Sequence, residues 1–419
     1  MFIEALIVAA CYLAFFANMN GVSGIVRPVI FALLFGAAFL SVATHKLHRI
    51  APTPAELLLY LVGLLSAVVS FSRSEDYCIY YTMYYVAIII FISVFTRTFS
   101  LERLLDLGAV MTILCIATCL LLQGRSYIVA LEISMGPNGL LRYSPFNNHP
   151  LLMGYIFGSG SLLLARRVYL ARTRWERNFM AVAVLLSWSM VLAASSRSTI
   201  VALMAAAAVA ALLEFRALRA MTGKGVAVAA AVIGVLAVGY FGFAGQYLIK
   251  ILEVDSSYRG LDTGATGRTD LWAKGMEALL SDPWLIAFGG GLRSSEYSVI
   301  GFLTENSYLT ILLDSGLIVG GALILFLAYS PIAALRRQRS ASAEQKKTLA
   351  FLPSYFVFLL IQCFFLRYFI GIGNPTSLLT LIFFVSLSMY AAFQSSPALA
   401  PRAPAGASKA SNAAVRVKT

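Results

Sequence analysis

The sequence contains twelve long apolar runs, and these constrain the fold more than any other feature. Most runs last about 17–22 residues, the length at which a helix crosses the hydrocarbon core of a bilayer. Backbone amides cannot stay unpaired in hydrocarbon, so a spanning chain forms helices or a closed barrel, and runs of this length do not alternate as barrel strands do. The sequence therefore predicts an all-α polytopic membrane protein. The predicted spans cover residues 3–18, 27–44, 54–72, 77–96, 104–122, 149–165, 178–194, 199–215, 225–244, 307–330, 348–366 and 376–393.

The Lys and Arg residues fall mainly in alternate connections between these spans. If the N-terminus is cytoplasmic, 21 of the 32 basic residues lie in cytoplasmic connections or in the tail. The positive-inside rule then predicts a multi-pass protein of the bacterial inner membrane with both termini in the cytoplasm. This topology accounts for most of the net charge of +13, so membrane lipid is the expected partner and nucleic acid is not. Glu4 replaces a basic leader region, so we expect the first run to be retained.

The connection at residues 245–305 differs from the others because its eight acidic residues outnumber its five basic ones. The apolar positions from Leu271 to Leu280 recur at helical spacing and predict an amphipathic helix on the membrane surface, ending at Asp282-Pro283. A second outer loop is expected at 123–148. The predicted organisation is given by four ranges: 1–244 with helices 1–9, 245–305 as a periplasmic loop, 306–393 with helices 10–12, and 394–419 as a disordered basic cytoplasmic tail.

Several kinds of chemistry lack their usual sequence signals. The five cysteines lie in or beside apolar runs, so no disulfide is expected, and Cys115 and Cys119 are interpreted as packing residues rather than metal ligands. No Walker motif, dinucleotide fingerprint, metal-ligand spacing or Asp-x-Asp pair occurs. This pattern argues against ATP hydrolysis and against a metal-dependent glycosyltransferase, and no cofactor or metal is expected.

Four arginines lie near the predicted outer boundary of the membrane, where an unpaired charge is costly unless it has a role. Guanidinium groups suit a phosphate ligand, and the hydroxyl-rich sequence from Ser195 to Thr199 adds further donors. For Arg197, in that hydroxyl-rich sequence, the alternative is a snorkelling helix cap. For Arg268, at the start of the loop helix, it is a salt bridge to Asp270 or Glu277. For Arg142 and Arg293 it is plain solvation. The candidates are Arg142, Arg197, Arg268 and Arg293.

Two acidic residues and one histidine complete the candidate set. Glu305 directly precedes the tenth predicted span, where a carboxylate acts either as a general base or as a helix-capping group. Asp314, two turns further on, is either an intramembrane partner for an arginine or a second functional carboxylate, and the pairing is favoured. His149 precedes Pro150 at a helix entrance and is either a donor to a ligand or a structural turn residue.

In order along the chain, four motifs resemble those of the O-antigen ligase/polymerase superfamily of bacterial envelope glycan enzymes. Arg142-Tyr-Ser-Pro-Phe-Asn-Asn-His149-Pro150 resembles its Arg/Gly/Pro-Asn segment, and Ser195-Ser-Arg197-Ser-Thr its Ser-Arg-Gly motif. Gly267-Arg268-Thr-Asp-Leu-Trp272, followed by Asp282-Pro283 and Gly289-Gly-Gly291, resembles its Arg-x-x-x-Trp helix and Gly-rich turn. Glu305-Asn306-Ser-Tyr308-Leu309 resembles its His-Asn-x-Tyr-Leu motif.

The resemblance implies a donor glycan linked to undecaprenyl pyrophosphate and an inverting transfer to an acceptor sugar hydroxyl. It implies that Arg142, Arg197, Arg268 and Arg293 bind the pyrophosphate. Glu305 is implied as the catalytic base, with Asn306, Tyr308 and His149 positioning donor or acceptor. A chain-length regulator and polysaccharide export proteins are implied as partners.

Two departures from the family pattern favour a polymerase of repeat units over the ligase that transfers polymer to lipid A-core. Glu305 stands where the ligases carry histidine, and the glycine after Gly316 falls at Gly320, one position later than the ligase spacing. The ligase therefore remains one alternative. A transporter of the lipid-linked glycan is another, although it would carry charges in the middle of several spans, and a structural subunit of an export complex is a third.

Overall fold

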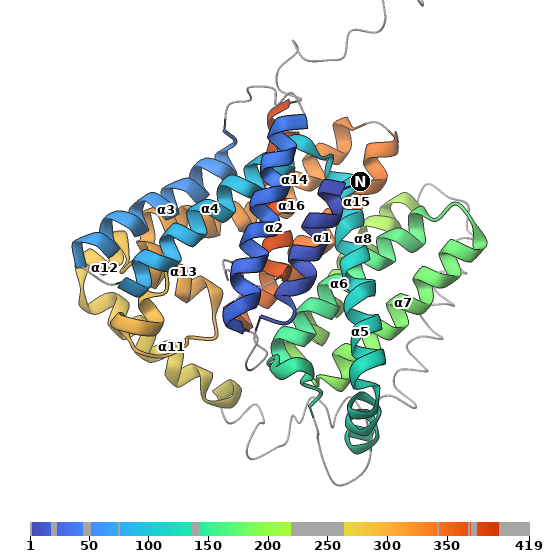
Figure 1. The fold of residues 1–419 in the computed structure, drawn as a ribbon, viewed down its shortest axis with the longest axis horizontal. Helices are drawn as coiled ribbons and strands as arrows, with labels where there is room; N and C mark the ends of the chain where they lie inside the picture. Colours follow the sequence, from blue (N-terminus) through green and yellow to red (C-terminus); the bar gives the residue numbers. More distant parts are fainter. Residues whose placement is uncertain are drawn as a thin grey trace, which may run out of the picture.

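The computed structural model describes residues 2–17, 23–44, 52–73, 76–135, 142–218, 264–341, 343–367, 369 and 375–393 of the 419-residue chain. Throughout these ranges the regular elements are helices, packed as a bundle with α11 and α12 along one side and one end (Figure 1). The longer helices are α1 (Phe2–Ala14), α2 (Ser23–Thr44), α3 (Pro54–Arg73), α4 (Asp76–Thr98), α5 (Leu101–Met135), α6 (Pro150–Leu170), α7 (Arg174–Ala193), α8 (Arg197–Leu218), α11 (Gly264–Ser281), α14 (Gly321–Ser340), α15 (Ala343–Phe365) and α16 (Pro375–Phe393). The shorter ones are η1 (Pro145–Asn147), α12 (Pro283–Phe288), η3 (Ser295–Val299), α13 (Ser307–Ser315) and η4 (Gly316–Gly320).

The prediction of an all-α polytopic membrane protein is confirmed. Each predicted span coincides with a helix except 225–244, which lies outside the described residues together with 245–263 and the tail 394–419. Among the described residues, six helical stretches are long and apolar enough to cross a membrane, and three shorter apolar helices accompany them. The six are Ile25–Thr44, Pro54–Ser72, Asp76–Thr98, Leu101–Ile133, Arg174–Ala193 and Ser307–Arg339, and the shorter three are Phe2–Ala14, Arg197–Leu213 and Leu349–Phe365.

The prediction of a loop over residues 123–148 is wrong in its first half. Helix α5 continues from the fifth span to Met135, with non-helical backbone angles at Gln123. Polar Gln123, Gly124 and Arg125 signalled the end of an apolar run, but they interrupt the helix only locally because apolar residues resume at Tyr127 and Ile128. The irregular part of the described connection begins at Arg142.

Helix α6 is the centre of the bundle, since residues 151–161 are all buried. Small residues on this helix let its neighbours approach closely. A methyl group built on Gly154 would meet Ser196 of the α7–α8 turn at 2.3 Å, and one built on Gly160 would meet Thr112 of α5 at 2.3 Å. The packing therefore fixes the N-terminal end of α6 against the start of α8.

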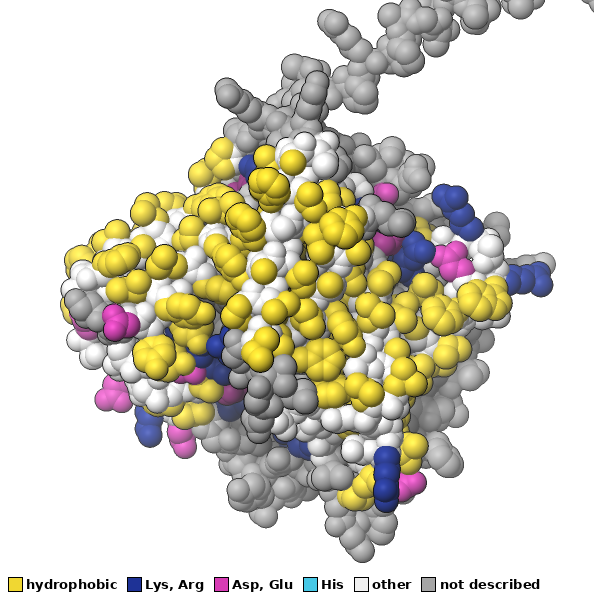
Figure 2. Space-filling view, in the orientation of Figure 1, with side chains coloured by type: hydrophobic (Ala, Val, Ile, Leu, Met, Phe, Trp, Pro, Cys, Tyr) yellow, Lys and Arg dark blue, Asp and Glu magenta, His cyan; other side chains and the backbone are white. Residues whose placement is uncertain are grey.

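The outer surface of the bundle is apolar. Large exposed hydrophobic side chains include Phe35 and Phe39 on α2, Leu64 on α3 and Leu121 on α5. In Figure 2 hydrophobic side chains cover most of the visible face, and charged side chains lie mainly toward its margins. An apolar surface of this extent would be unstable in water, so this is the face that lipid covers.

One group of ion pairs lies at the helix ends that the sequence assigns to the cytoplasm. Arg103 at the start of α5 pairs with Glu4 of α1 at 2.5 Å, and Arg166 of α6 pairs with Asp106 of α5 at 2.7 Å. The grouping agrees with the predicted alternation of connections. The side of the membrane that this end faces stays a prediction.

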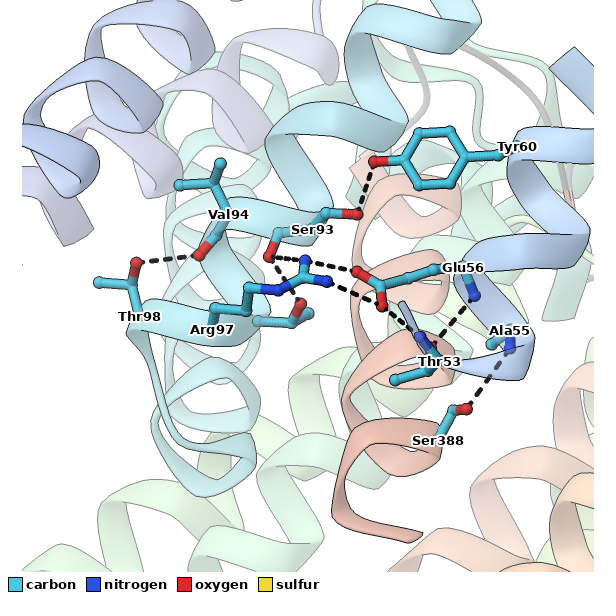
Figure 3. A network of polar contacts seen from close by, with 10 residues as sticks. Thr53, Ala55, Glu56, Tyr60, Ser93, Val94, Arg97, Thr98 and Ser388 are labelled. Carbon is cyan, nitrogen blue, oxygen red and sulfur yellow. Dashed lines mark hydrogen bonds and ion pairs between the residues drawn. The ribbon is translucent and has the colours of Figure 1, made fainter. Parts of the chain in front are cut away.

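A buried capping box anchors the same end (Figure 3). Thr53 and Glu56 exchange hydrogen bonds at the start of α3, where the Thr53 N–H donates to Glu56 Oε2 at 2.8 Å and the Glu56 N–H donates to Thr53 Oγ1 at 3.2 Å. Arg97 of α4 donates to both oxygens of Glu56, at 2.6 and 3.2 Å. The carboxylate therefore joins two helices as well as capping one.

Candidate functional site

The α7–α8 turn supports the first arginine-containing segment. Ser195 adopts a positive φ of 48°, which reverses the chain between the two helices. The main-chain N–H of Tyr143 donates to the Ala193 carbonyl at 2.8 Å, and Arg142 Nε donates to the Ala194 carbonyl at 3.3 Å. Arg197, the first residue of α8, is half-buried. The structure thus brings the segments of Arg142 and Arg197 together.

His149 caps α6 and faces a set of charges. Its Nδ1 accepts a hydrogen bond from the Leu151 N–H at 3.3 Å, which leaves Nε2 to carry the proton of the neutral ring. Burial lowers the pKa of His149, the charge of Glu305 opposes this, and the charges of three arginines lower the pKa further. These arginines are Arg142, Arg268 and Arg367.

Glu305 sits on a strained and firmly held piece of backbone. Its φ is 52°, a region that residues with a side chain rarely adopt. On one side the Thr304 carbonyl accepts a hydrogen bond from Trp272 Nε1 at 2.9 Å. On the other the Asn306 side chain caps α13 by accepting from the Leu309 N–H at 3.1 Å. The helix-capping role considered for Glu305 therefore belongs to Asn306, and the Glu305 carboxylate makes no hydrogen bond or ion pair within the described ranges.

Arg268 is placed beside Glu305 by the same contact, because Trp272 lies one turn further along α11. Burial lowers the pKa of Arg268 and the Glu305 charge opposes this, yet an arginine keeps its charge at neutral pH. The salt bridges considered with Asp270 and Glu277 are not formed, since these described residues make no ion pair with Arg268. The helix begins at Gly264, so the prediction that Arg268 lies at its N-terminus is wrong by about one turn.

Arg367 is the member of this cluster that the sequence analysis missed. Ser307 Oγ donates to the Leu366 carbonyl and accepts from the Phe369 N–H at 3.3 Å, so the start of α13 holds the segment after α15. Arg367 is an isolated charge directly after an apolar span, the same criterion that selected the other arginines. It acts on His149 and also contacts Glu296 at 3.4 Å.

Arg293 belongs to a neighbouring group of side chains. Its Nε donates to Glu296 Oε2 at 2.8 Å, and its guanidinium lies 4.1 Å from the ring centroid of Tyr81. Burial alone would lower the pKa of Arg293, but the hydrogen bond and charge of Glu296 raise it above its ordinary value. Arg293 is therefore already paired with a carboxylate, which the sequence interpretation did not anticipate.

Asp314 holds the turn that carries Arg293. Its carboxylate accepts from the main-chain N–H groups of Arg293 at 2.9 Å and Ser295 at 3.1 Å. The predicted pairing of Asp314 with an arginine is thus corrected, because the partner is the arginine main chain rather than the guanidinium. The positive φ of Arg293, 64°, turns the amide toward Asp314 and the side chain toward Glu296.

Asn306 and Tyr308 have structural partners. Asn306 caps α13 as described, and the Tyr308 hydroxyl donates to the Leu360 carbonyl of α15 at 2.7 Å. Their role in positioning donor or acceptor stays a prediction. The five cysteines are buried and free, and the described part of the chain holds no group of three or more His, Cys, Asp and Glu suited to a metal ion.

The cluster around His149 and Glu305 lies far from the buried ion pairs. Helix α6 has His149 at its N-cap and Arg166 in its last turns, and a helix of this length spans about 30 Å. We call the group Arg142, His149, Arg268, Glu305 and Arg367 the cationic cluster. Fold and cluster together define a polytopic membrane protein with a charged, partly buried site at one end of its bundle.

Comparison with known proteins agrees with this class. Residues 182–325 match the family described as O-antigen ligase, and they extend from α7 into α14. The match supports the resemblance to the O-antigen ligase/polymerase superfamily over this part of the chain, which holds three of the four motifs. Members of this family are glycosyltransferase-like ligases and polymerases, which supports an enzyme of that type. No curated protein sequence matches the chain.

Proposed function

We propose that the protein polymerises undecaprenyl-pyrophosphate-linked oligosaccharide repeats into a surface polysaccharide or exopolysaccharide at the periplasmic face of the inner membrane. One observation carries this proposal. Arg142, Arg268 and Arg367 come from three distant segments and act together on His149, with the Glu305 carboxylate in the same group. A cationic cluster, with one carboxylate that makes no hydrogen bond or ion pair among the described residues, provides both charge for a diphosphate and a base for a hydroxyl.

The reaction exchanges one C–O bond for another. The acceptor hydroxyl oxygen attacks the anomeric carbon of the donor sugar, and the bond from that carbon to the diphosphate breaks with its electrons on the phosphate oxygen. Inversion follows because attack and departure occur on opposite faces. The departing diphosphate gains negative charge, and guanidinium groups held in place before the reaction stabilise that charge best.

Arg268 is the strongest candidate for the diphosphate contact. It is half-buried and carries its charge, but it has no carboxylate bound within the described ranges, so its donors are available. Arg142 and Arg367 add charge from the other segments, and Arg197 begins α8 three residues after the carbonyl that Arg142 contacts. Arg293, already bound to Glu296, is assigned to the edge of this site.

Glu305 is the proposed base that takes the acceptor proton. Its backbone is fixed on both sides while its carboxylate remains unengaged among the described residues, an arrangement that suits proton transfer to a bound hydroxyl. His149, neutral at pH 7 because its pKa is lowered, offers Nε2–H as a hydrogen-bond donor to a sugar or phosphate oxygen. Neither role requires a metal ion.

One observation favours the ligase as the second candidate. The ligase motif has histidine at the position of Glu305, and here His149 supplies an imidazole to the same cluster from another helix. The missing histidine therefore argues less strongly for a polymerase than the sequence alone suggested. A transporter is less favoured, because the intramembrane carboxylate of Asp314 is occupied by the turn at Arg293 and Ser295.

The test is a set of single replacements analysed in the native host. Arg268→Ala and Glu305→Gln should each abolish the long polysaccharide and leave single repeats on the polyprenyl carrier. Lys274→Ala, an exposed cation on the same helix as Arg268, is the matched control and should make normal polymer. Full-length polymer that fails to reach lipid A-core would instead establish the ligase. Normal glycan from both site variants, at normal protein levels, would remove the proposed site.

A further inference from the structure

Three tyrosines from two distant segments stack into one group, in which Tyr77 and Tyr297 are exposed and Tyr81 is half-buried. Tyr77 and Tyr81, one turn apart on α4, face Tyr297 of η3. The ring centroids of Tyr77 and Tyr297 are 5.0 Å apart with the planes inclined by 9°, and those of Tyr81 and Tyr297 are 6.4 Å apart and inclined by 17°. Tyr77 is 64% exposed and Tyr297 is 45% exposed. We call these three side chains the tyrosine platform.

Charged groups border the platform. The Arg293 guanidinium lies 4.1 Å from the Tyr81 ring centroid and 5.1 Å from that of Tyr297. Glu296, the residue before Tyr297, binds both Arg293 and Arg367. Because the guanidinium lies over the Tyr81 and Tyr297 rings, the open aromatic surface is on the Tyr77 side of the platform, next to guanidinium donors and carboxylate acceptors.

The backbone that carries this group is held rigidly. Asp314 fixes the amides of Arg293 and Ser295, and the Leu292 N–H donates to Ser66 Oγ of α3 at 2.7 Å. Arg367 is shared, since it contacts Glu296 and also acts on His149. The tyrosine platform is thus continuous with the cationic cluster.

This chemistry matches a sugar ring. The face of an aromatic ring carries partial negative charge and attracts the C–H groups that line one face of a pyranose, while the hydroxyls around the ring edge need donors and acceptors. We infer that the tyrosine platform, through the exposed Tyr77 side and with Arg293 and Glu296 beside it, binds a pyranose residue of the glycan chain next to the reacting end. This inference rests on the proposed function, and it assigns sugar binding to a part of that site separate from the cationic cluster.

An aromatic belt at the membrane interface is the competing explanation, because tyrosines gather at headgroup depth in many membrane proteins. Tyr80 distinguishes the two. It is 55% exposed on the same helix, but its ring contacts are with Tyr81 and Tyr84 of α4. A headgroup role predicts that Tyr77 and Tyr80 behave alike, whereas a sugar-binding role requires Tyr77 and not Tyr80.

The experiment measures binding of oligosaccharides to the full-length protein in lipid nanodiscs. The probe is the mixture released by mild acid hydrolysis from the surface polysaccharide of the producing bacterium, and the readout is saturation-transfer NMR. Tyr77→Ala and Tyr297→Ala should each raise Kd about five- to tenfold, the loss expected for one stacked aromatic contact. Tyr77→Trp, which keeps a ring, should retain binding, and Tyr80→Ala should bind as the wild type does.

Arg268→Ala separates this inference from the proposed function. It should bind the oligosaccharides normally while losing transfer, because its guanidinium contacts the diphosphate instead. If Arg268→Ala keeps transfer, the proposed site fails and the binding result still stands. If wild type binds no oligosaccharide, if Tyr77→Ala binds normally, or if Tyr77→Ala and Tyr80→Ala reduce binding and membrane insertion equally, the platform is not a sugar site.

Discussion

The Asp314 carboxylate accepts a hydrogen bond from the main-chain N–H of Arg293 at 2.9 Å. Asp314 lies in α13, at the start of a membrane-spanning stretch, and this contact fixes the position of Arg293 in the preceding loop. The second oxygen accepts from the Ser295 N–H at 3.1 Å. Two amides of the turn, one buried and one half-buried, thereby gain an acceptor from outside the turn. The position of Arg293 beside Tyr81 follows from this contact rather than from any regular element.

Replacement of Asp314 should therefore destabilise the protein. Asp314→Ala leaves both amides without this acceptor, and we expect the free energy of unfolding to fall by about 2 kcal/mol or more. The five buried free cysteines provide a readout, because a thiol-reactive dye reports their exposure during a thermal melt. Asp270→Ala, at an exposed position of α11, should melt as wild type does. Equal melting of the two variants would show that Asp314 does not hold the turn.

Two glycines, Gly289 after α12 and Gly316 after α13, lie in close contact with the backbone of each other's segment. Gly289 and Gly316 have φ values of 76° and 66°, and a methyl group on either would meet backbone of the other segment at 2.5 or 2.3 Å. Gly289→Ala and Gly316→Ala should each prevent close packing and lower the melting temperature strongly. Gly301→Ala is the matched control, because its φ is 72° but nothing lies within 4 Å of the added methyl. It should show only backbone strain, about 1–2 kcal/mol. A similar loss in all three variants would contradict this close contact.

The buried pair of Glu56 and Arg97 should be costly to break. Glu56 is 0% exposed, so Arg97→Met leaves a buried carboxylate without its counter-charge, at a cost of about 3–5 kcal/mol. The double variant Glu56→Gln/Arg97→Met removes both charges and keeps an acceptor for the Thr53 N–H, so it should recover most of the loss. Thermal melts of the three proteins measure this. A double variant no more stable than Arg97→Met would indicate that burial of the lone carboxylate is not the cause.

The fold was largely predictable because length and apolar composition determine membrane helices almost alone. Within the described ranges, the spans were wrong where a polar interruption, at Gln123 to Arg125, did not end α5. The site was less predictable. Isolated charges at span ends identified Arg142, Arg268 and Glu305, and Arg367 satisfied the same criterion without being chosen. The partners of Arg293 could not be predicted from the sequence. Its contact with Glu296 depends on a turn of positive φ, and its contact with Tyr81 depends on a helix more than 200 residues away.

The electrostatic coupling of His149 with its neighbours gives a pH-dependent prediction. Burial and three arginines hold the pKa of His149 below its ordinary value of about 6.5, while Glu305 raises it. Glu305→Gln should lower that pKa further and Arg367→Gln should raise it. Histidine-selective isotope labelling and NMR titration measure both shifts, with His45→Gln and His48→Gln introduced to leave one signal. Glu277→Gln, at an exposed position of α11, should leave the titration unchanged.

The sign for stability follows from the same shift. Between pH 6.5 and the lower pKa of folded His149, the unfolded chain binds a proton that the folded chain does not. The free energy of unfolding therefore falls as the pH is lowered through this window, and it levels off below the window. Glu305→Gln should extend the window to lower pH and Arg367→Gln should narrow it. If thermal melts show the same pH dependence with and without Glu305, the carboxylate does not lie within electrostatic reach of His149 and the cationic cluster is wrongly assembled.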